Sequence, residues 1–176
     1  MNFMNNIKAI IFDYGRTLHD DDTSSLFVDA KEIVDYCSKK YKLAIVSVTF
    51  PETMEKRRGQ IRAAGWDKVF SYIELVPRGE EKDAAFERAV RKLGVSYNEI
   101  AVIDDRIVRG IRWGNKHGCM TIWLQKGKFA EEVPTKETEN PKYIITELNE
   151  VEKVIENLNT YKFSPTNTAK STNLHA

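Results

Sequence analysis

Several polar residues in this chain are of types that could act together on a phosphate ester. These residues are Asp13, Ser47, Lys82, Asp104 and Asp105. Four of them end or follow apolar stretches, and Lys82 lies at the start of a helical pattern. Carboxylates are the hard oxygen ligands that Mg²⁺ prefers, whereas a hydroxyl and an ammonium group can hold phosphate oxygens. Each residue alone is weak evidence, because Asp is also favoured in turns and helix caps. Together they predict a site for a phosphate monoester and a divalent cation.

The elements that must position these residues are apolar strands alternating with amphipathic helices. Strands are expected at 10–12, 43–49, 69–73, 100–103, 120–124 and 142–146, and helices at 26–37, 52–64, 81–93, 107–117 and 148–158. The charged segment 131–140 is expected to be a loop. Such alternation predicts a three-layer, Rossmann-like α/β fold with a parallel sheet, whose ligands bind at the carboxyl ends of the strands.

Composition indicates one ordinary globular domain. The chain has 176 residues, 41% of them hydrophobic and 30% charged, and a net charge of +1 that gives no general attraction to nucleic acid or membrane. We expect a single domain over 1–159 and a polar tail over 160–176. Cys37 and Cys119 show no metal-ligand spacing, so both are expected in the core of a protein in a reducing compartment. No export signal or spanning segment is visible at the start, which favours the cytoplasm.

The order of these motifs resembles that of the haloacid dehalogenase-like (HAD) superfamily. The resemblance runs from about Ile7 to Leu158. The first motif is matched by Asp13 with Thr17 and Leu18, the second by Ser47, the third by Lys82 and the fourth by Asp104-Asp105.

The resemblance implies a phosphatase in which Asp13 attacks phosphorus and forms an aspartyl-phosphate. Catalytic roles would fall to Asp13, Lys82 and Ser47. Mg²⁺ would be held by Asp13, the backbone carbonyl of Gly15, Asp104 and Asp105. The substrate would be bound by Ser47, Val48, Lys82 and Arg16.

Gly15 is a departure from the family pattern, because phosphatases of this family usually carry a second aspartate there. That aspartate protonates the leaving group and later activates water. Its loss predicts slow turnover, since general acid–base help is typically worth about a hundredfold to ten-thousandfold. His19 is the nearby residue that could replace it, although an exposed loop histidine is the more ordinary interpretation.

The intervals between the motifs leave no room for a cap domain, since a helix and a strand already fill each one. An open site is therefore expected, covered only by the segment 14–25 or by another subunit of a homo-oligomer. Such a site favours a large phosphorylated substrate, such as a phosphoprotein, nucleic acid or sugar chain, or else an oligomer that supplies the missing wall.

Nucleic acid is a possible substrate that the sequence does not favour. Asp104-Asp105-Arg106 resembles the fourth motif of uncapped polynucleotide 3′-phosphatases, and six Lys or Arg with no acid lie from Arg106 through Lys128. A charged helix face is usually only solvated, however. Trp113 and Trp123 could stack on bases, but aromatic residues in such elements are more often core.

Three other interpretations compete with a phosphatase. A haloacid dehalogenase also lacks an aspartate at the position of Gly15, but it needs a cap. A catalytically degenerate member would bind metal and a phosphorylated ligand, or a partner protein, without turnover. A phosphoacceptor receiver domain would place its acidic pair early and its lysine late, the reverse of the order here.

Overall fold

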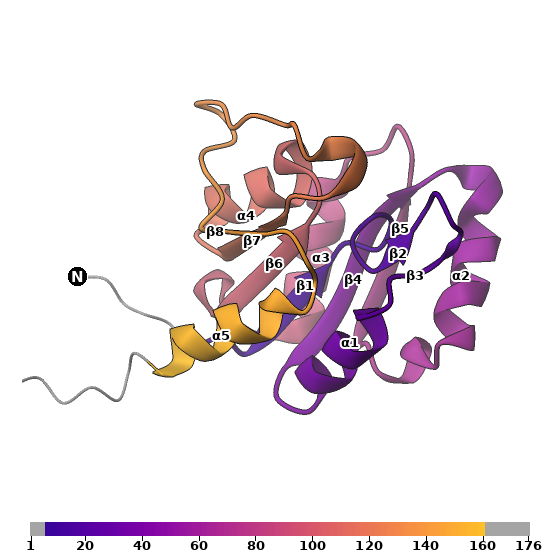
Figure 1. The fold of residues 1–176 in the computed structure, drawn as a ribbon, viewed down its shortest axis with the longest axis horizontal. Helices are drawn as coiled ribbons and strands as arrows, with labels where there is room; N and C mark the ends of the chain where they lie inside the picture. The colour runs from indigo at the N-terminus through magenta and orange to yellow at the C-terminus, as the bar shows by residue number, and fades with distance from the viewer. Residues whose placement is uncertain (1–5, 161–176) are drawn as a thin grey trace, which may run out of the picture.

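The computed structural model describes residues 6–160, which form a six-stranded parallel sheet between two layers of helices (Figure 1). The strands are β1 (Ala9–Phe12), β4 (Lys42–Thr49), β5 (Tyr72–Pro77), β6 (Ile100–Asp104), β7 (Met120–Leu124) and β8 (Tyr143–Ile145). Their order in the sheet is β5-β4-β1-β6-β7-β8. The predicted three-layer α/β fold is confirmed.

The helices cover both faces of the sheet, so the central strands are apolar on both sides. They are α1 (Ala30–Ser38), α2 (Met54–Ala63), α3 (Lys82–Leu93), α4 (Arg112–His117) and α5 (Glu150–Thr160). In β1, Ile10 and Phe12 pack into the core shared with α1, α2 and α5, whereas Ala9 and Ile11 pack into the core shared with α3 and α4. Both cysteines are free and buried, as expected.

The segment after β1 differs from the sequence prediction. Leu26 was expected at the start of a helix, but Ser25–Leu26 is a short strand, β3, which pairs antiparallel with β2 (His19–Asp20). The helix begins only at Ala30. The apolar character of Leu26 serves the hairpin, whose two strands are too short to give a period-2 signal.

The position of the third strand was also wrong. The third strand was expected at 69–73 but runs over Tyr72–Pro77, because Trp66–Lys68 forms a 3₁₀ turn and Phe70 then packs into the core beside it. The helix expected at 107–117 is present, and its first turn, Ile107–Ile111, is π-helical before α4. The predicted tail lies outside the described residues, apart from Thr160 at the end of α5. Within residues 6–160, no helix is long and apolar enough to cross a membrane.

The sheet order brings the predicted site residues to one edge. β1 lies between β4 and β6, with Phe12 level with Ile45 and Ile103. Asp13 follows directly, and its backbone N–H donates to the carbonyl of Ile103 at 2.9 Å. The carboxylates that end β1 and β6 are therefore neighbours because of the parallel register.

Gly114 shows how closely α4 approaches the sheet. A Cβ atom there would lie 2.6 Å from Cγ2 of Thr121 on β7 and 3.4 Å from Cγ2 of Val102 on β6. Both contacts are with β-branched side chains that are buried in the sheet and stiff about χ1. The helix can lie here only because residue 114 has no side chain.

We predict that Gly114→Ala lowers the free energy of unfolding by about 1–3 kcal/mol, since an added methyl group overpacks this contact. Urea denaturation measures the change. Gly59→Ala on α2 is the matched control, because its Cβ would meet nothing within 4 Å. It should be neutral or stabilising by up to about 1 kcal/mol. Equal effects of the two substitutions would contradict the close approach.

Candidate active site

Lys82 joins the two strand ends at the centre of the site. Its Nζ atom donates to Oδ1 of Asp13 and to Oδ2 of Asp104, both at 2.7 Å. All three side chains are buried, with at most 6% of their surface exposed. As the first residue of α3, Lys82 stands where the helix dipole disfavours a cation, and these two carboxylates provide the compensation.

Burial and charge act in opposite directions on these groups. Burial raises the pKa of the Asp13 carboxyl, and the Lys82 ammonium opposes that rise. Burial also works against the charged form of Lys82, but Asp104 and Asp13 outweigh it and raise the pKa of the ammonium group. Lys82 is therefore held as a cation between two acids.

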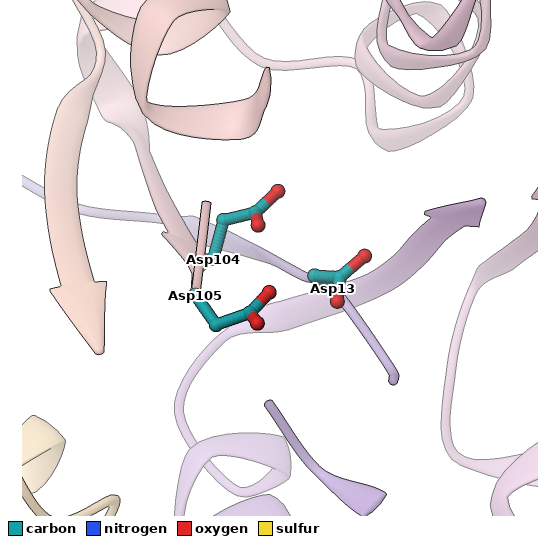
Figure 2. Close-up of side chains that lie close together, drawn as sticks. All are labelled: Asp13, Asp104 and Asp105. Carbon is teal, nitrogen blue, oxygen red and sulfur yellow. The ribbon is translucent and has the colours of Figure 1, made fainter. Parts of the chain in front are cut away.

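Asp105 completes a cluster of three carboxylates that fits a divalent cation. One oxygen from each of Asp13, Asp104 and Asp105 lies within 4.8 Å of the others, and the side chains of Asp104 and Asp105 extend toward Asp13 (Figure 2). Oδ2 of Asp105 is buried without a hydrogen-bond partner among the described residues. Burial, with the charges of Asp13 and Asp104, raises the pKa of Asp105 to about 9. One lysine does not neutralise three buried acids, so the donor set fits Mg²⁺.

Asp104 is fixed in place by the chain that follows it. Its Oδ1 accepts the backbone N–H of Arg106 at 2.9 Å, and its Oδ2 accepts that of Gly110 at 3.1 Å. A Cβ at residue 110 would lie 2.4 Å from Oδ2 of Asp104. The π-helical turn therefore packs its glycine directly against the carboxylate.

The second predicted motif also reaches the site. The Ser47 hydroxyl accepts the backbone N–H of Gly15 at 3.5 Å, and its hydrogen bond to Asp13 favours the ionised carboxylate. The Thr17 hydroxyl donates to Oδ2 of Asp13 at 3.3 Å. The geometry thus brings Ser47, Lys82 and the three acids together around Asp13.

A cavity of about 320 Å³ opens beside Asp13 and carries much positive charge. Val48, Gly15 and Arg16 line it, which places these three predicted residues at the cavity. Arg16 forms a two-point ion pair with Asp22, at 2.8 and 3.1 Å. The other basic side chains of the wall are Arg57, Arg78, Arg106, Arg109 and Lys128.

Arg57 occupies the space that a side chain at position 15 would need. A Cβ on Gly15 would lie 2.6 Å from Nη1 of Arg57 and 3.0 Å from Oδ2 of Asp21. Asp21, in the turn between β2 and β3, binds Nη2 of Arg57 at 2.9 Å. The missing side chain at position 15 is therefore replaced by an ion pair between the hairpin and α2.

His19 does not face the cavity, and it is not exposed. The expectation of an exposed loop histidine is wrong, because only 5% of its surface is accessible. Its ring stacks on Tyr14, its Nδ1 lies 2.9 Å from Oδ1 of Asp21, and its Nε2 lies 3.1 Å from the Gln60 amide nitrogen. Both ring nitrogens are thus engaged, and His19 supports Asp21.

The basic stretch from Arg106 through Lys128 is not one continuous positive surface. Arg106 pairs with Glu132, Arg112 with Asp83, and Lys126 with Glu147. Trp113 and Trp123 are buried, as expected of core residues. Neither tryptophan is therefore exposed for stacking on a base.

Arg57 and Asp21 were not among the residues predicted for the site. Arg57 lies four residues before Ile61, the buried residue of α2. That spacing puts it on the sheet-facing side, which is the signal that could have identified it. Nothing in the sequence indicates that Asp21 reaches α2.

Sequence comparisons relate part of this chain to known hydrolases. Residues 78–151 match a family model described as HAD-hydrolase-like. A stretch of 73 residues is 30% identical to the glyceraldehyde 3-phosphate phosphatase of Methanopyrus kandleri, covering 42% of this chain and 31% of that protein. The chain thus spans less than a third of that relative.

Solved structures share the fold. The putative HAD-hydrolase YfnB of Bacillus subtilis, bound to magnesium, has a TM-score of 0.67 at 14% identity, over 86% of this chain and 99% of that one. A HAD phosphatase of Thermococcus onnurineus has a TM-score of 0.66 at 14% identity, over 85% and 98%. L-2-haloacid dehalogenase structures share the fold too. At these identities the likeness is one of fold alone.

We predict that Asp105→Asn raises the melting temperature of the metal-free protein at pH 8. A carboxyl whose folded pKa is raised keeps its proton in the folded state after the unfolded chain has lost it, so stability falls as pH rises from about 4 toward 9. Replacing it by a neutral amide removes that loss. Each kcal/mol gained adds roughly 2–4 °C, measured by calorimetry in EDTA.

Magnesium should raise the melting temperature of the wild type and have little effect on the variant. The control is Asp67→Asn, which changes an exposed acid and should behave as the wild type. An unchanged pH dependence in Asp105→Asn would show that another group causes the loss of stability.

Proposed function

We propose that this chain, which belongs to the HAD-like hydrolases, is an Mg²⁺-dependent phosphatase that acts through an aspartyl-phosphate on Asp13. The observation that carries the proposal is Lys82, whose Nζ lies 2.7 Å from both Asp13 and Asp104. A buried lysine between two strand-end acids, beside a cationic cavity, suits the binding of a phosphoryl group next to a nucleophilic carboxylate. The buried free cysteines suit a reducing compartment, and we place the protein in the cytoplasm.

In the first step a carboxylate oxygen of Asp13 forms a bond to phosphorus while the bond to the leaving oxygen breaks. Lys82 and Ser47 hold phosphoryl oxygens, and the Lys82 ammonium opposes the rise that burial causes in the pKa of Asp13. A divalent cation held by Asp13, Asp104, Asp105 and the Gly15 carbonyl would neutralise charge on the phosphoryl group. In the second step water attacks phosphorus, and the Asp13 carboxylate is regenerated.

Turnover of ordinary esters is expected to be slow, because Gly15 offers no side chain to move a proton. The absence of a side chain at Gly15 also favours the alternative of a catalytically degenerate protein that binds a phosphorylated ligand without turnover. The arrangement of polar side chains around Asp13 favours catalysis over binding alone, so a phosphatase is the function that we propose first.

We predict that p-nitrophenyl phosphate is hydrolysed only in the presence of Mg²⁺, and that Asp13→Asn abolishes the reaction. The amide is a poor nucleophile, so the loss should exceed about a thousandfold, the scale of covalent and acid–base catalysis together. Release of p-nitrophenol measures the rate.

The matched control for this substitution is Asp67→Asn, which should retain full activity. Undiminished activity of Asp13→Asn would exclude Asp13 as the nucleophile. Absence of turnover in every sample would favour the binding protein over the phosphatase.

We further predict that Gly15→Asp restores turnover only when Arg57 is also removed. In the single variant the new carboxylate would lie against Arg57 and remain ionised, which makes it a poor proton donor. Gly15→Asp with Arg57→Ala should hydrolyse glycerol 3-phosphate about 10–100 times faster than Gly15→Asp alone, within the range of acid–base catalysis. Steady-state kinetics measure this. Equal rates in the two variants would mean that Arg57 does not hinder position 15.

A further inference from the structure

Among the residues the structure describes, the cavity wall beside Gly15 has no carboxyl group outside the metal-binding cluster that is free to protonate a departing oxygen. Asp21 is the acid nearest to Gly15 on that wall, and each of its oxygens already accepts a bond, from His19 and from Arg57. Although burial opposes the shift, these partners lower the pKa of Asp21. Asp13 and Asp105 belong to the carboxylate cluster.

Arg57 takes the place of a proton donor on this wall. A guanidinium is charged at all ordinary pH and does not release its proton. Asp21 binds its Nη2, and the Tyr14 ring lies 5.5 Å from its central carbon. Nη1 is buried and has no hydrogen-bond partner among the described residues. A fixed donor without an acceptor thus stands next to Gly15, on the wall of the cavity that contains Asp13.

Further cations of the same cavity have no acidic partner. Arg78 stacks over Phe50 at 4.5 Å and Lys128 lies 5.5 Å from the Phe129 ring, but neither they nor Arg109 has a carboxylate within 4.0 Å among residues 6–160. By contrast, the nearby Arg106 and Arg112 are paired with acids. Three cations without an acidic partner within that distance thus line the same cavity as Arg57.

We propose that the substrate is a phosphoanhydride or an acyl phosphate, whose leaving group departs as a phosphate or carboxylate anion, and that Nη1 of Arg57 binds the departing oxygen. The inference rests on the proposed function and narrows its substrate class. An alkoxide must be protonated to leave, which this wall does not provide. A phosphate or carboxylate leaves as a stable anion, which a fixed cation stabilises.

The step balances without an acid. The Asp13 oxygen bonds to phosphorus, and the bond between phosphorus and the bridging oxygen breaks. Its electron pair stays on the leaving phosphate or carboxylate, which keeps its negative charge beside Arg57. Water then forms a bond to phosphorus, the Asp13 carboxylate is released, and one proton passes to solvent.

The test compares leaving groups in the wild type and in Arg57→Gln. The substrates are acetyl phosphate, pyrophosphate and glycerol 3-phosphate, with phosphate release followed in Mg²⁺ and the Asp13→Asn rate subtracted. Acyl phosphates are intrinsically reactive, so the decisive quantity is the selective effect of the variant. Arg57→Gln should lower kcat/KM for one or both anhydrides by about 10²–10³, and for glycerol 3-phosphate by less than about threefold.

Arg58→Gln is the matched control, because Arg58 is the next residue on α2 but pairs with Glu55 and does not line the cavity. It should leave every rate unchanged. A selective loss with pyrophosphate alone identifies a phosphate leaving group, and a loss with acetyl phosphate alone identifies a carboxylate. An equal loss on all three substrates, or none, overturns the inference while leaving the phosphatase intact. A preference for a 3′-phosphorylated oligonucleotide that does not depend on Arg57 also overturns it.

Binding gives a readout that needs no turnover. Methylenediphosphonate, a stable diphosphate analogue, should bind the wild type at least about tenfold more tightly than methylphosphonate in calorimetry, a difference of 1.4 kcal/mol. Arg57→Gln should remove that difference and Arg58→Gln should keep it. Equal affinities in the wild type would overturn the inference. Selective binding of methylenediphosphonate without hydrolysis of any substrate would instead refute the phosphatase activity and support phosphoanhydrides as the class of ligand.

Discussion

The ion pairs of Lys82 with Asp13 and Asp104 are the constraint on which the site depends. Burying these charges is costly unless they are paired, and removing one partner of such a network typically costs about 3–5 kcal/mol. The pairs join α3 to the ends of β1 and β6. Lys82 therefore couples the stability of the sheet edge to the charge state of its acids.

The rest of the fold serves this edge. The parallel register places Asp13 beside the end of β6, and the π-helical turn after β6 holds Asp104 through the backbone N–H of Gly110. Gly110 lets the π-helical turn lie close to the Asp104 carboxylate, and Gly114 lets α4 lie close to the sheet. Backbone geometry thus positions the acids, and in the cluster Oδ2 of Asp105 has no hydrogen-bond partner among the described residues.

Much of this could be predicted from the sequence, because the central strands are continuous apolar runs and a parallel sheet brings their ends together. Asp13, Ser47, Lys82 and the acidic pair therefore follow from local patterns. Arg57 and Asp21 do not, because their contact joins a hairpin to a helix 36 positions later in the chain. The hairpin itself was missed because β2 and β3 have two residues each. The orientation of His19 depends on the same long-range packing.

The two arms of the Arg57 guanidinium have different surroundings. Nη2 holds the hairpin through Asp21, and Nη1 lies next to Gly15, buried and without a hydrogen-bond partner among the described residues. Because a guanidinium is a planar fork, it can keep the first contact while it makes a second. An ammonium group is a single compact charge, so one nitrogen would have to contact both the hairpin and the ligand. The choice of arginine lets one residue be a structural tether and a ligand contact at the same time.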